Sequence, residues 1–404
     1  MATTSFLYHS FGVVGYHHLK TEYVNGAAYH HIERHRHRQR CQHCGSRWYE
    51  LVFSGWFERI LQTLPVGRRR QFVVIHGHEL RCKVCGRTRR EEIPLSRGKR
   101  RLTKALENLA IDMCGIATIK DVATWLGLHW TLVKSVFKEH LRQRAKRISL
   151  KDVRLIAVDE FAVRKGHKYM TVVLNLTTGQ VLHSQQGRGA ESLRGFLNKL
   201  KRAGAQLEAV AMDMWPAYVR AVEDVFPDVD IVHDPFHVVA MANKAIDDTR
   251  RDLYRELQAE ERKVIKGCRF LLLKGLENLK EPALDRLLSM TDLNETLLRG
   301  YLLKEDLRMF WRMPNRAVGC QYLDNWIKEA NSSGLKHFIR LAETLDRHRG
   351  RLLTYFDHRI STGPLEGLNN KIKVLKRQAY GFRDMEYFRL RLAFLHENVL
   401  AYPG

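Results

Sequence analysis

Two kinds of hydrophobic periodicity alternate along the middle of the chain and predict a mixed α/β region. Short apolar runs with strand character occupy residues 153–158, 168–176, 180–186, 207–212 and 229–233. Apolar residues with helical spacing lie between them, at residues 190–203 and after Pro216. The predicted order is therefore β-β-β-α-β-α-β, which corresponds to a mixed sheet with flanking helices.

The rest of the chain is predicted to be mainly helical. Helical spacing without strand patterns covers residues 103–147 and 240–351, and another helix begins near residue 363. The exceptions are the four-cysteine segment described below and the histidine-rich start of the chain, residues 1–40, for which we expect strands followed by a solvated basic arm at residues 31–38. Metal binding by these histidines is the less favoured alternative. The chain is thus a multidomain α+β protein, with a four-cysteine segment at 1–100, a helix-turn-helix at 101–150, a core at 151–239 and 352–404, and a helical insertion at 240–351.

Residues 121–137 have the spacing of a helix-turn-helix motif. Ala123 would be the small residue where the helices cross, Gly127 would form the turn, and Val133 and Val136 would anchor the second helix. Two generic packed helices could give the same pattern. In the DNA-binding interpretation, the residues that face a groove are His129, Thr131, Lys134 and Lys138.

The charge of the chain favours a polyanionic partner. The 404 residues carry a formal net charge of +24, from 68 basic and 44 acidic side chains. Such an excess indicates nucleic acid more often than an anionic membrane surface. The candidate DNA contacts in the basic run before the helix-turn-helix are Arg97, Lys99, Arg100 and Arg101. Because no stretch approaches about 18 apolar residues and no secretory signal is evident, we expect a cytoplasmic protein without a membrane partner.

Four of the seven cysteines form two Cys-x-x-Cys-Gly units. Cys41 and Cys44 make the first and Cys82 and Cys85 the second, and a strand at residues 71–78 suggests that a hairpin joins them. Four thiolates close a tetrahedral site, which indicates structural zinc rather than a redox pair. Alternative zinc ligands are His43, His76 and His78. The remaining cysteines, Cys114, Cys268 and Cys320, are predicted to be buried apolar side chains.

Three carboxylates are candidates for a second metal site. Asp159 and Asp213 each follow a buried-type strand, and Glu366 lies in the first turn of the helix that begins after Thr362. Crowded carboxylates repel unless cations neutralise them, which favours divalent metal ions. Two Mg²⁺ ions about 4 Å apart, with Mn²⁺ as a substitute, would support phosphoryl transfer. On the same helix, Asn370, Lys373 and Arg377 follow Glu366 at helical spacing and would contact phosphates.

Simpler roles remain for other polar residues near these positions. Glu160 would point to the opposite face of the sheet from Asp159. Asp234 precedes Pro235 and has the pattern of a helix N-cap. His237 could contact DNA or metal, although an ordinary hydrogen-bonded histidine is the favoured interpretation.

Several motifs together resemble the DDE transposases of bacterial insertion sequences in the ISL-three family. They are Asp159-Glu-Phe-Ala162, Met212-Asp-Met-Trp215, His233-Asp-Pro-Phe-His-Val238 and the long block Gly363-Pro-Leu-Glu-Gly-Leu-Asn-Asn-Lys-Ile-Lys373. The resemblance implies a ribonuclease H-like core interrupted by a helical insertion, with Asp159, Asp213 and Glu366 as the catalytic, magnesium-binding triad.

The activity implied by this resemblance is metal-dependent cleavage and strand transfer of DNA. The zinc segment and the helix-turn-helix would bind the terminal inverted repeats, with target DNA as a second partner. A homodimer or higher multimer is expected because two ends must be brought together, in the bacterial cytoplasm at the nucleoid. The alternatives are a non-catalytic DNA-binding regulator derived from a transposase and a nuclease that cuts without joining.

Overall fold

The computed structural model describes residues 6–164, 168–258, 262–263, 265–292 and 295–397. Within this part of the chain, residues up to Lys146 form one compact unit, called unit 1, and residues from Arg147 to Glu397 form unit 2. The described residues of the predicted four-cysteine segment and residues 101–146 of the predicted helix-turn-helix segment lie in unit 1. The predicted helical insertion and the described residues of the predicted core lie in unit 2.

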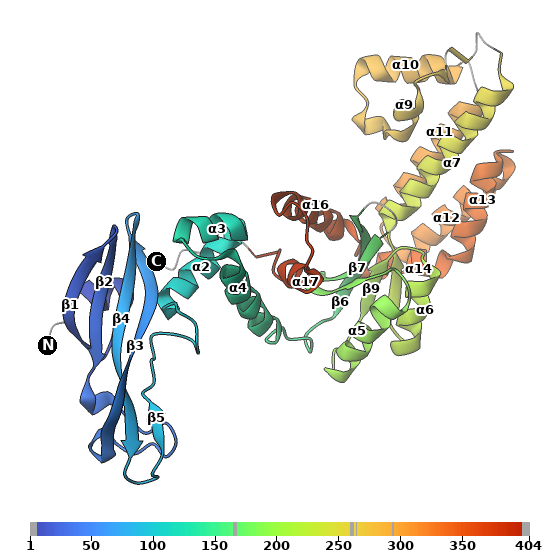
Figure 1. The fold of residues 1–404 in the computed structure, drawn as a ribbon. Coiled ribbons are helices and arrows are strands. Elements are labelled where there is room, and N and C mark those ends of the chain that lie inside the picture. Colours follow the sequence, from blue (N-terminus) through green and yellow to red (C-terminus); the bar gives the residue numbers. More distant parts are fainter. Residues whose placement is uncertain (1–5, 165–167, 259–261, 264, 293–294, 398–404) are drawn as a thin grey trace. The chain divides into compact units, whose positions relative to one another are not determined.

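Unit 1 contains a mixed five-stranded sheet, preceded by α1 (Phe6–Phe11). Its strands are β1 (Tyr16–Val24), β2 (Ala27–Arg34), β3 (Leu51–Val66), β4 (Arg69–Cys82) and β5 (Thr88–Arg90), with short 3₁₀ turns η1 (Arg36–Arg38) and η2 (Trp48–Glu50). The spatial order is β1-β2-β4-β3, and β5 pairs with the cysteine end of β4 (Figure 1). The long β3–β4 hairpin is the one predicted between the two cysteine pairs.

The predicted basic arm at residues 31–38 is wrong for its first half, because residues 31–34 lie inside β2. This strand pairs antiparallel with β1 and parallel with β4. Every second residue of β2 (Ala28, His30 and Ile32) is buried, and this alternation gives the strand an inward face. His31 Nδ1 lies 2.9 Å from Nε2 of His76 on β4. The first element of the described residues is a helix, α1, where strands were predicted.

Three helices complete unit 1: α2 (Lys104–Ile116), α3 (Ile119–Leu126) and α4 (Trp130–Ala145). Gly127 ends α3 with a positive φ of 63°, a conformation that glycine adopts without steric cost. Ala123, Val133 and Val136 are buried, as the helix-turn-helix pattern predicted. Gln62 Nε2 on β3 donates to the carbonyl oxygen of Leu126 at 2.8 Å, so the sheet and the helices are joined directly.

Unit 2 contains the predicted mixed sheet, and the predicted order of strands and helices is confirmed. Its elements up to the last strand are β6 (Leu155–Arg164), β7 (Lys168–Asn175), β8 (Val181–Gln186), α5 (Glu191–Arg202), β9 (Ala209–Met212), α6 (Pro216–Val225) and β10 (Asp230–His233). The spatial order is β10-β9-β6-β7-β8. β6 does not end before Asp159 as predicted, because β7 continues to pair with it as far as Arg164.

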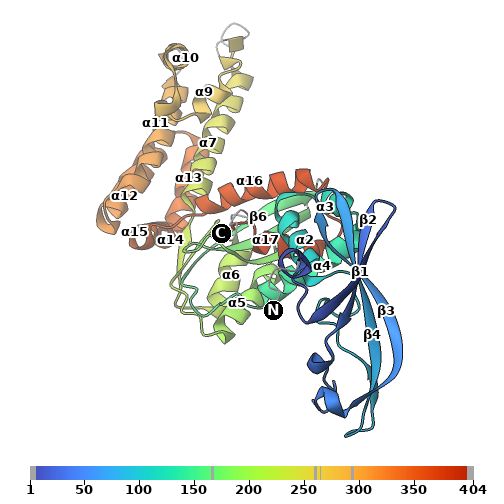
Figure 2. The ribbon, with the colours of Figure 1, turned by 90° about the vertical axis from the view of Figure 1, so that its left-hand side faces the viewer.

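The remaining elements of unit 2 are helical. They are α7 (Pro235–Glu256), α9 (Arg269–Leu273), η3 (Leu276–Asn278), α10 (Glu281–Asp292), α11 (Glu295–Met309), η4 (Phe310–Arg312), α12 (Arg316–Ser332), α13 (Lys336–Arg347), α14 (Arg349–Leu353), α15 (Tyr355–His358), α16 (Gly363–Gln378) and α17 (Met385–Ala393). α7 starts directly after β10 and packs against α11 and α13 beyond the sheet (Figure 2). The predicted boundary between residues 239 and 240 therefore falls inside a continuous helix.

The two faces of the unit 2 sheet are covered by different helices. Ile156 and Val158 face a core shared with α5 and α6. Ala157 and Val172 face a second core shared with α16 and α17 (Figure 1). The helical insertion has a core of its own, which includes Trp326. Because successive strand residues alternate between faces, the position of a polar residue in β6 decides which helices it meets.

Two further observations concern composition. Among the described helices, none has both the length and the apolar character needed to cross a membrane. Cys114 and Cys268 are fully buried as predicted, whereas Cys320 is only partly buried at the edge of the helical core.

Candidate functional site

Three aspartates follow one another across neighbouring strands of the unit 2 sheet. β6 and β9 pair in parallel with Ala157 opposite Ala211, so Asp159 and Asp213 follow at the same level. β10 continues the row, with Asp234 directly after its last residue. Residues that are opposite one another in parallel strands point to the same face. Asp159 therefore shares the face of Ala157, toward α16.

Asp159 is held from two sides. Its Oδ1 accepts the backbone N–H of Glu160 at 2.7 Å, and its Oδ2 accepts Nδ2–H of Asn369 on α16 at 3.1 Å. Burial raises the pKa of Asp159, and the nearby Asp234 carboxylate acts in the same direction against these hydrogen bonds and His237. A carboxylate in this situation is stabilised in its ionised form by a cation. Asn369 was not predicted as a site residue.

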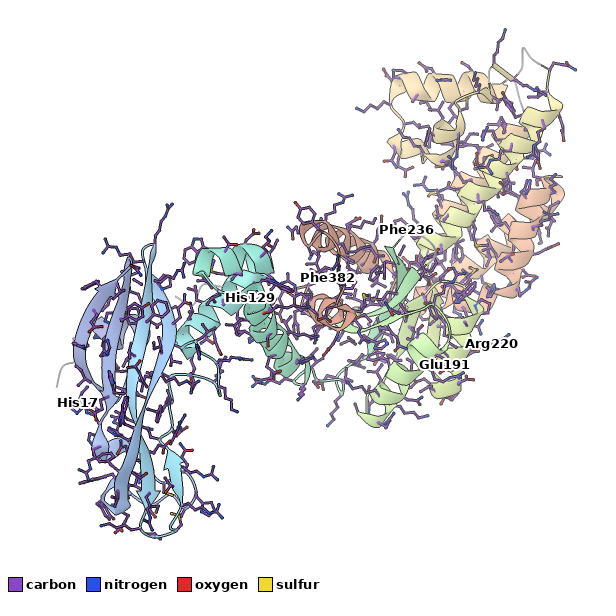
Figure 3. The ribbon with its side chains drawn as sticks, in the orientation of Figure 1. His17, His129, Glu191, Arg220, Phe236 and Phe382 are labelled. Carbon is purple, nitrogen blue, oxygen red and sulfur yellow. The ribbon has the colours of Figure 1, made fainter. Side chains whose placement is uncertain are left out.

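Asp213 is more open than Asp159, with 41% of its side chain exposed. Its Oδ1 accepts the backbone N–H of Met214 at 2.6 Å and lies 3.5 Å from Nδ1 of His237 on α7. His237 thus contacts the candidate site, which the sequence left as the less favoured of two interpretations. Its neighbour Phe236 is exposed at the end of α7 that adjoins the sheet (Figure 3).

Glu366 lies on the exposed side of the first turn of α16. This helix follows β6: Asn369 reaches Asp159, and two turns later Lys376 Nζ donates to the carbonyl oxygen of Ala162 at 3.0 Å. Glu366 is one turn before Asn369 on the same side of the helix. The carboxylates are nevertheless not a closed ligand set, since none of them joins a group of metal-ligating atoms within 4.8 Å in the described part of the chain.

Asp234 does not have the helix-capping role predicted for it. It occupies the N-cap position of α7, but its side chain makes no capping hydrogen bond. Instead, its Oδ1 accepts the backbone N–H of Thr362 at 2.9 Å, immediately before α16 begins. Asp234 is only 1% exposed. It therefore connects the end of β10 to the helix that carries Glu366, a contact between distant segments that the local pattern with Pro235 could not reveal.

The ligand atoms at this site suit a hard divalent cation. They are carboxylate and amide oxygens, the type of ligand that Mg²⁺ and Mn²⁺ prefer. Two of these oxygens, Asp234 Oδ2 and Asn369 Oδ1, are buried without a hydrogen-bond partner among the described residues. Buried oxygens of this kind normally have a partner. The residues present therefore fit a divalent metal ion.

Glu160 lies on the other face of the sheet, as predicted. It shares the side of Ile156 and Val158, which meets α5 and α6. Burial raises the pKa of Glu160, and a hydrogen bond with Tyr218 of α6 acts in the opposite direction. Glu160 thus belongs to a separate polar cluster behind the sheet.

The four predicted zinc ligands are gathered at one end of the unit 1 sheet. Their ligand atoms all lie within 4.8 Å of one another, and the Sγ atoms of Cys41 and Cys85, and of Cys44 and Cys82, are 3.6 Å apart. A tetrahedral zinc with Zn–S bonds of about 2.3 Å separates its sulfurs by about 3.8 Å. Hydrogen bonds from Ser46 lower the pKa of the Cys44 thiol to about 6, which favours the thiolate that zinc requires. The cluster fits a structural zinc ion.

The three histidines considered as alternative zinc ligands are not part of this group. His43 is exposed, His76 lies 2.9 Å from His31, and His78 lies 2.8 Å from a Glu33 carboxylate oxygen. His76 and His78 thus both contact residues of the neighbouring strand β2.

The candidate DNA contacts of the helix-turn-helix are at the start of α4. His129 is the N-cap residue and accepts the backbone N–H of Thr131 at 3.4 Å, and both side chains are exposed. Lys134 and Lys138 follow at one-turn spacing and are half-buried. The first turns of such a helix are where this motif contacts bases.

The basic run before α2 is partly used for structure. Arg97 and Arg100 form ion pairs at 3.2 and 3.4 Å with Glu107, whose side chain is fully buried. A buried carboxylate requires such partners. Lys99 and Arg101 are exposed and are the better placed of the four for an external phosphate. On α16, Asn370, Lys373 and Arg377 are also exposed, and Lys373 Nζ donates to Asn370 Oδ1 at 3.3 Å.

Two family models match parts of this chain. Residues 156–392 match the DDE family ISL3, described as a transposase, and residues 91–141 match the helix-turn-helix domain of transposase family ISL3. The transposase for insertion sequence element IS1001 of Bordetella parapertussis is 33% identical over 368 residues, which cover 90% of this chain and 89% of that protein. The transposase for IS1557 of Mycobacterium tuberculosis is 28% identical over 373 residues, covering 86% and 83%.

Among solved structures, the Drosophila P element transposase strand transfer complex aligns with a TM-score of 0.38 and 10% identity, over 73% of this chain and 91% of that chain. The family matches define the class of protein, a DNA transposase, which is an enzyme that catalyses DNA strand transfer. The chain belongs to transposase family ISL3, the ISL-three family that its motifs resemble.

Proposed function

We propose that Asp159, Asp213 and Glu366 are the DDE triad of this transposase and hold two magnesium ions, for which manganese can substitute. The observation that carries this proposal is the hydrogen bond from Asn369 to Asp159, because it attaches the helix of Glu366 to the strand of Asp159. When bound, the metal ions activate a water or a 3′-hydroxyl and stabilise the leaving oxygen.

The residues of the chain then have separate tasks. Asn369 orients the Asp159 carboxylate, Asp234 fixes the start of α16, and His237 lies beside Asp213. The exposed side chains of Asn370, Lys373 and Arg377 continue along α16 and contact DNA phosphates. In this division one of the three metal ligands, Glu366, shares helix α16 with the phosphate contacts.

The strand order β10-β9-β6-β7-β8 supports a ribonuclease H-like core. Three strands in an antiparallel meander come first along the chain, and two parallel strands then extend the sheet from β6. In this proposal the core comprises residues 151–239 and 352–404, and the helical insertion lies between them.

Unit 1 provides DNA recognition in this proposal. Zinc bound by Cys41, Cys44, Cys82 and Cys85 stabilises the hairpin end, and the helix-turn-helix binds the terminal inverted repeats. A homodimer or higher multimer brings two ends together with target DNA, in the bacterial cytoplasm at the nucleoid.

The test is cleavage of labelled DNA that carries the terminal repeats of the element, with Mg²⁺ or with EDTA. Wild-type protein should nick at the repeat boundary only with Mg²⁺ and then join that end to a second DNA. Asp159→Asn, Asp213→Asn and Glu366→Gln should each lower the cleavage rate by about 10³-fold or more, with repeat binding unchanged.

The matched control is Glu191→Gln, which neutralises an exposed carboxylate on α5, away from the face of Asp159 (Figure 3). It should cleave like the wild type. Near wild-type cleavage by one of the three variants would remove that residue from the triad. Binding without any cleavage would favour a non-catalytic regulator, and cleavage without joining would favour a nuclease.

A further inference from the structure

A pocket opens beside Asp213 within unit 2. Its volume is about 480 Å³, within the range of about 300–1,000 Å³ that small-molecule sites occupy. It lies where the end of β9, the N-terminal half of α7 and the C-terminal end of α13 meet. Its lining residues are Asp213, Met214, Trp215, His237, Ala240, Met241, Lys244, Thr344 and His348.

The wall of the pocket offers a fixed aromatic ring. Trp215 Nε1 donates to the carbonyl oxygen of Arg188 at 3.1 Å, and the guanidinium carbon of Arg188 lies 4.9 Å from the ring centroid. Trp215 still exposes 37% of its surface. Met214 and Met241 add soft apolar surface. A flat apolar group that enters would therefore meet a ring that is already held in position.

Two polar groups of the lining are neutral. The Thr344 hydroxyl donates to the carbonyl oxygen of Arg340 at 2.9 Å and can still accept a hydrogen bond, and burial lowers the pKa of His348, which keeps its imidazole uncharged at neutral pH. The charged residues in the lining are Asp213 and Lys244, and the Lys244 side chain is 80% exposed. Neutral donors and acceptors around an apolar pocket suit the edges and faces of a nucleobase better than a phosphate or a charged peptide.

We propose that this pocket receives one unstacked DNA base, from the nucleotide next to the phosphate that is cleaved. The inference rests on the proposed function, because it places that phosphate at Asp159 and Asp213. Asp213 belongs to both the candidate triad and the pocket lining, and a base is joined to its phosphate through a single sugar. Unstacking costs a few kcal/mol, and stacking on an aromatic ring offsets a comparable amount.

Unstacking also explains why a pocket at this position is useful to the reaction. A base that leaves the duplex frees the backbone on both sides of it to bend. The phosphate can then approach carboxylates that lie at the level of the sheet. Phe236, exposed beside His237, adds apolar surface at the same end of α7.

Two variants test the pocket by different routes. Trp215→Ala removes the stacking ring, and Ala240→Phe fills the pocket from an exposed position on α7. Each is assayed on terminal-repeat DNA with Mg²⁺, and on the same DNA with an abasic nucleotide placed in turn at each position around the cleaved bond. The matched control is Phe270→Ala, which removes a 70% exposed aromatic ring on α9 outside the pocket.

Both pocket variants should cleave intact DNA about tenfold more slowly or worse, while repeat binding and the control stay unchanged. One abasic position should restore their cleavage, since no base then needs a place, and it should not restore Asp213→Asn. Wild-type rates in both variants, or slow cleavage that no abasic position restores, would overturn the pocket proposal and leave the triad intact. If the wild type does not cleave with Mg²⁺, the proposed function fails, and the base site fails with it.

Discussion

The two candidate metal sites of this transposase are built in opposite ways. The four sulfurs of unit 1 already lie within 4.8 Å of one another and come from two similar turns. Gly45 and Gly86 donate to the carbonyl oxygens of Cys41 and Cys82 at 3.0 and 2.9 Å, one in each turn. The carboxylates of unit 2 come from a strand, a strand end and a helix, and they form no such group among the described residues.

The difference matches the roles proposed for the two sites. A structural site is closed by its own ligands, so the local chain can form it completely. A catalytic site keeps positions open for the substrate, and its ligands are oriented by neighbouring residues. In unit 2 these neighbours are Asn369 and Asp234, which connect α16 to β6 and β10.

The largest effect is expected from opening the closed site. Cys44→Ser should lower the zinc content well below one ion per chain and destabilise unit 1 by several kcal/mol, because structural zinc contributes roughly 10–16 kcal/mol in zinc-finger peptides. Terminal-repeat binding should fall with it. Zinc analysis, thermal unfolding and a binding assay measure these three quantities.

The control is Cys320→Ser, which removes a partly buried thiol from unit 2. It should keep both zinc and repeat binding. A Cys44→Ser protein with full zinc and an unchanged unfolding temperature would contradict a structural zinc role for the cluster.

A smaller effect is expected from loosening the open site. Asp234→Ala removes the acceptor for the Thr362 N–H, so α16 loses its connection to β10 and Glu366 its position. Cleavage should fall about 10- to 100-fold, and more Mg²⁺ should be needed for half-maximal activity. The measurement is the cleavage rate as a function of Mg²⁺ concentration.

Asp234→Asn separates anchoring from charge, since its side-chain oxygen can still accept the Thr362 N–H. It should retain most of the activity that Asp234→Ala loses. An equal loss of cleavage activity in both variants would show that the negative charge of Asp234 matters, and not its hydrogen bond to Thr362. Full activity in both would contradict any positioning role.

The smallest effect concerns the pH dependence of stability. It depends on a residue that supports the open site and is not one of its candidate metal ligands. His233, the last residue of β10, is fully buried, and neither ring nitrogen has a hydrogen-bond partner in the described structure. Burial lowers the pKa of His233 to about 3. In the unfolded chain His233 takes up a proton near pH 6.5, whereas in the folded protein it does not. The contribution of His233 to stability is therefore complete above about pH 6.5 and is lost as the pH decreases below that value.

Between pH 7 and pH 5 this single residue should cost about 2 kcal/mol of unfolding free energy. His233→Phe should show a correspondingly smaller loss over the same interval, as measured by urea unfolding with EDTA present. An equal pH dependence in both proteins would contradict the assignment to His233.

Local patterns revealed much of this molecule because its main elements obey them. The alternation of apolar runs predicted the order of the unit 2 elements, and the repeated Cys-x-x-Cys-Gly unit predicted which sulfurs would meet. Asp159 and Asp213 were predicted as candidate metal ligands because each follows an apolar strand segment. In all these cases the information lies within a few residues of the position in question.

The features that were missed depend on contacts between distant segments. Asp234 had the local pattern of a cap, yet its partner Thr362 is 128 residues away. Asn369 lies one turn from Glu366, a spacing that would have suggested it only once α16 was known to follow β6. His31 of β2 was assigned to a solvated arm because the pairing of β2 with β4 involves residues more than 40 positions later.

The order of ligands along the chain also sets an order during synthesis on the ribosome. The four cysteines of the candidate zinc site occur by residue 85, and the helix-turn-helix is complete by Ala145. Helix α16, in contrast, begins only at Gly363. N-terminal units fold first as a chain emerges. If the proposed roles hold, a nascent or prematurely terminated chain has its DNA-recognition unit before it has the complete triad, and we expect it to occupy DNA ends without cutting them.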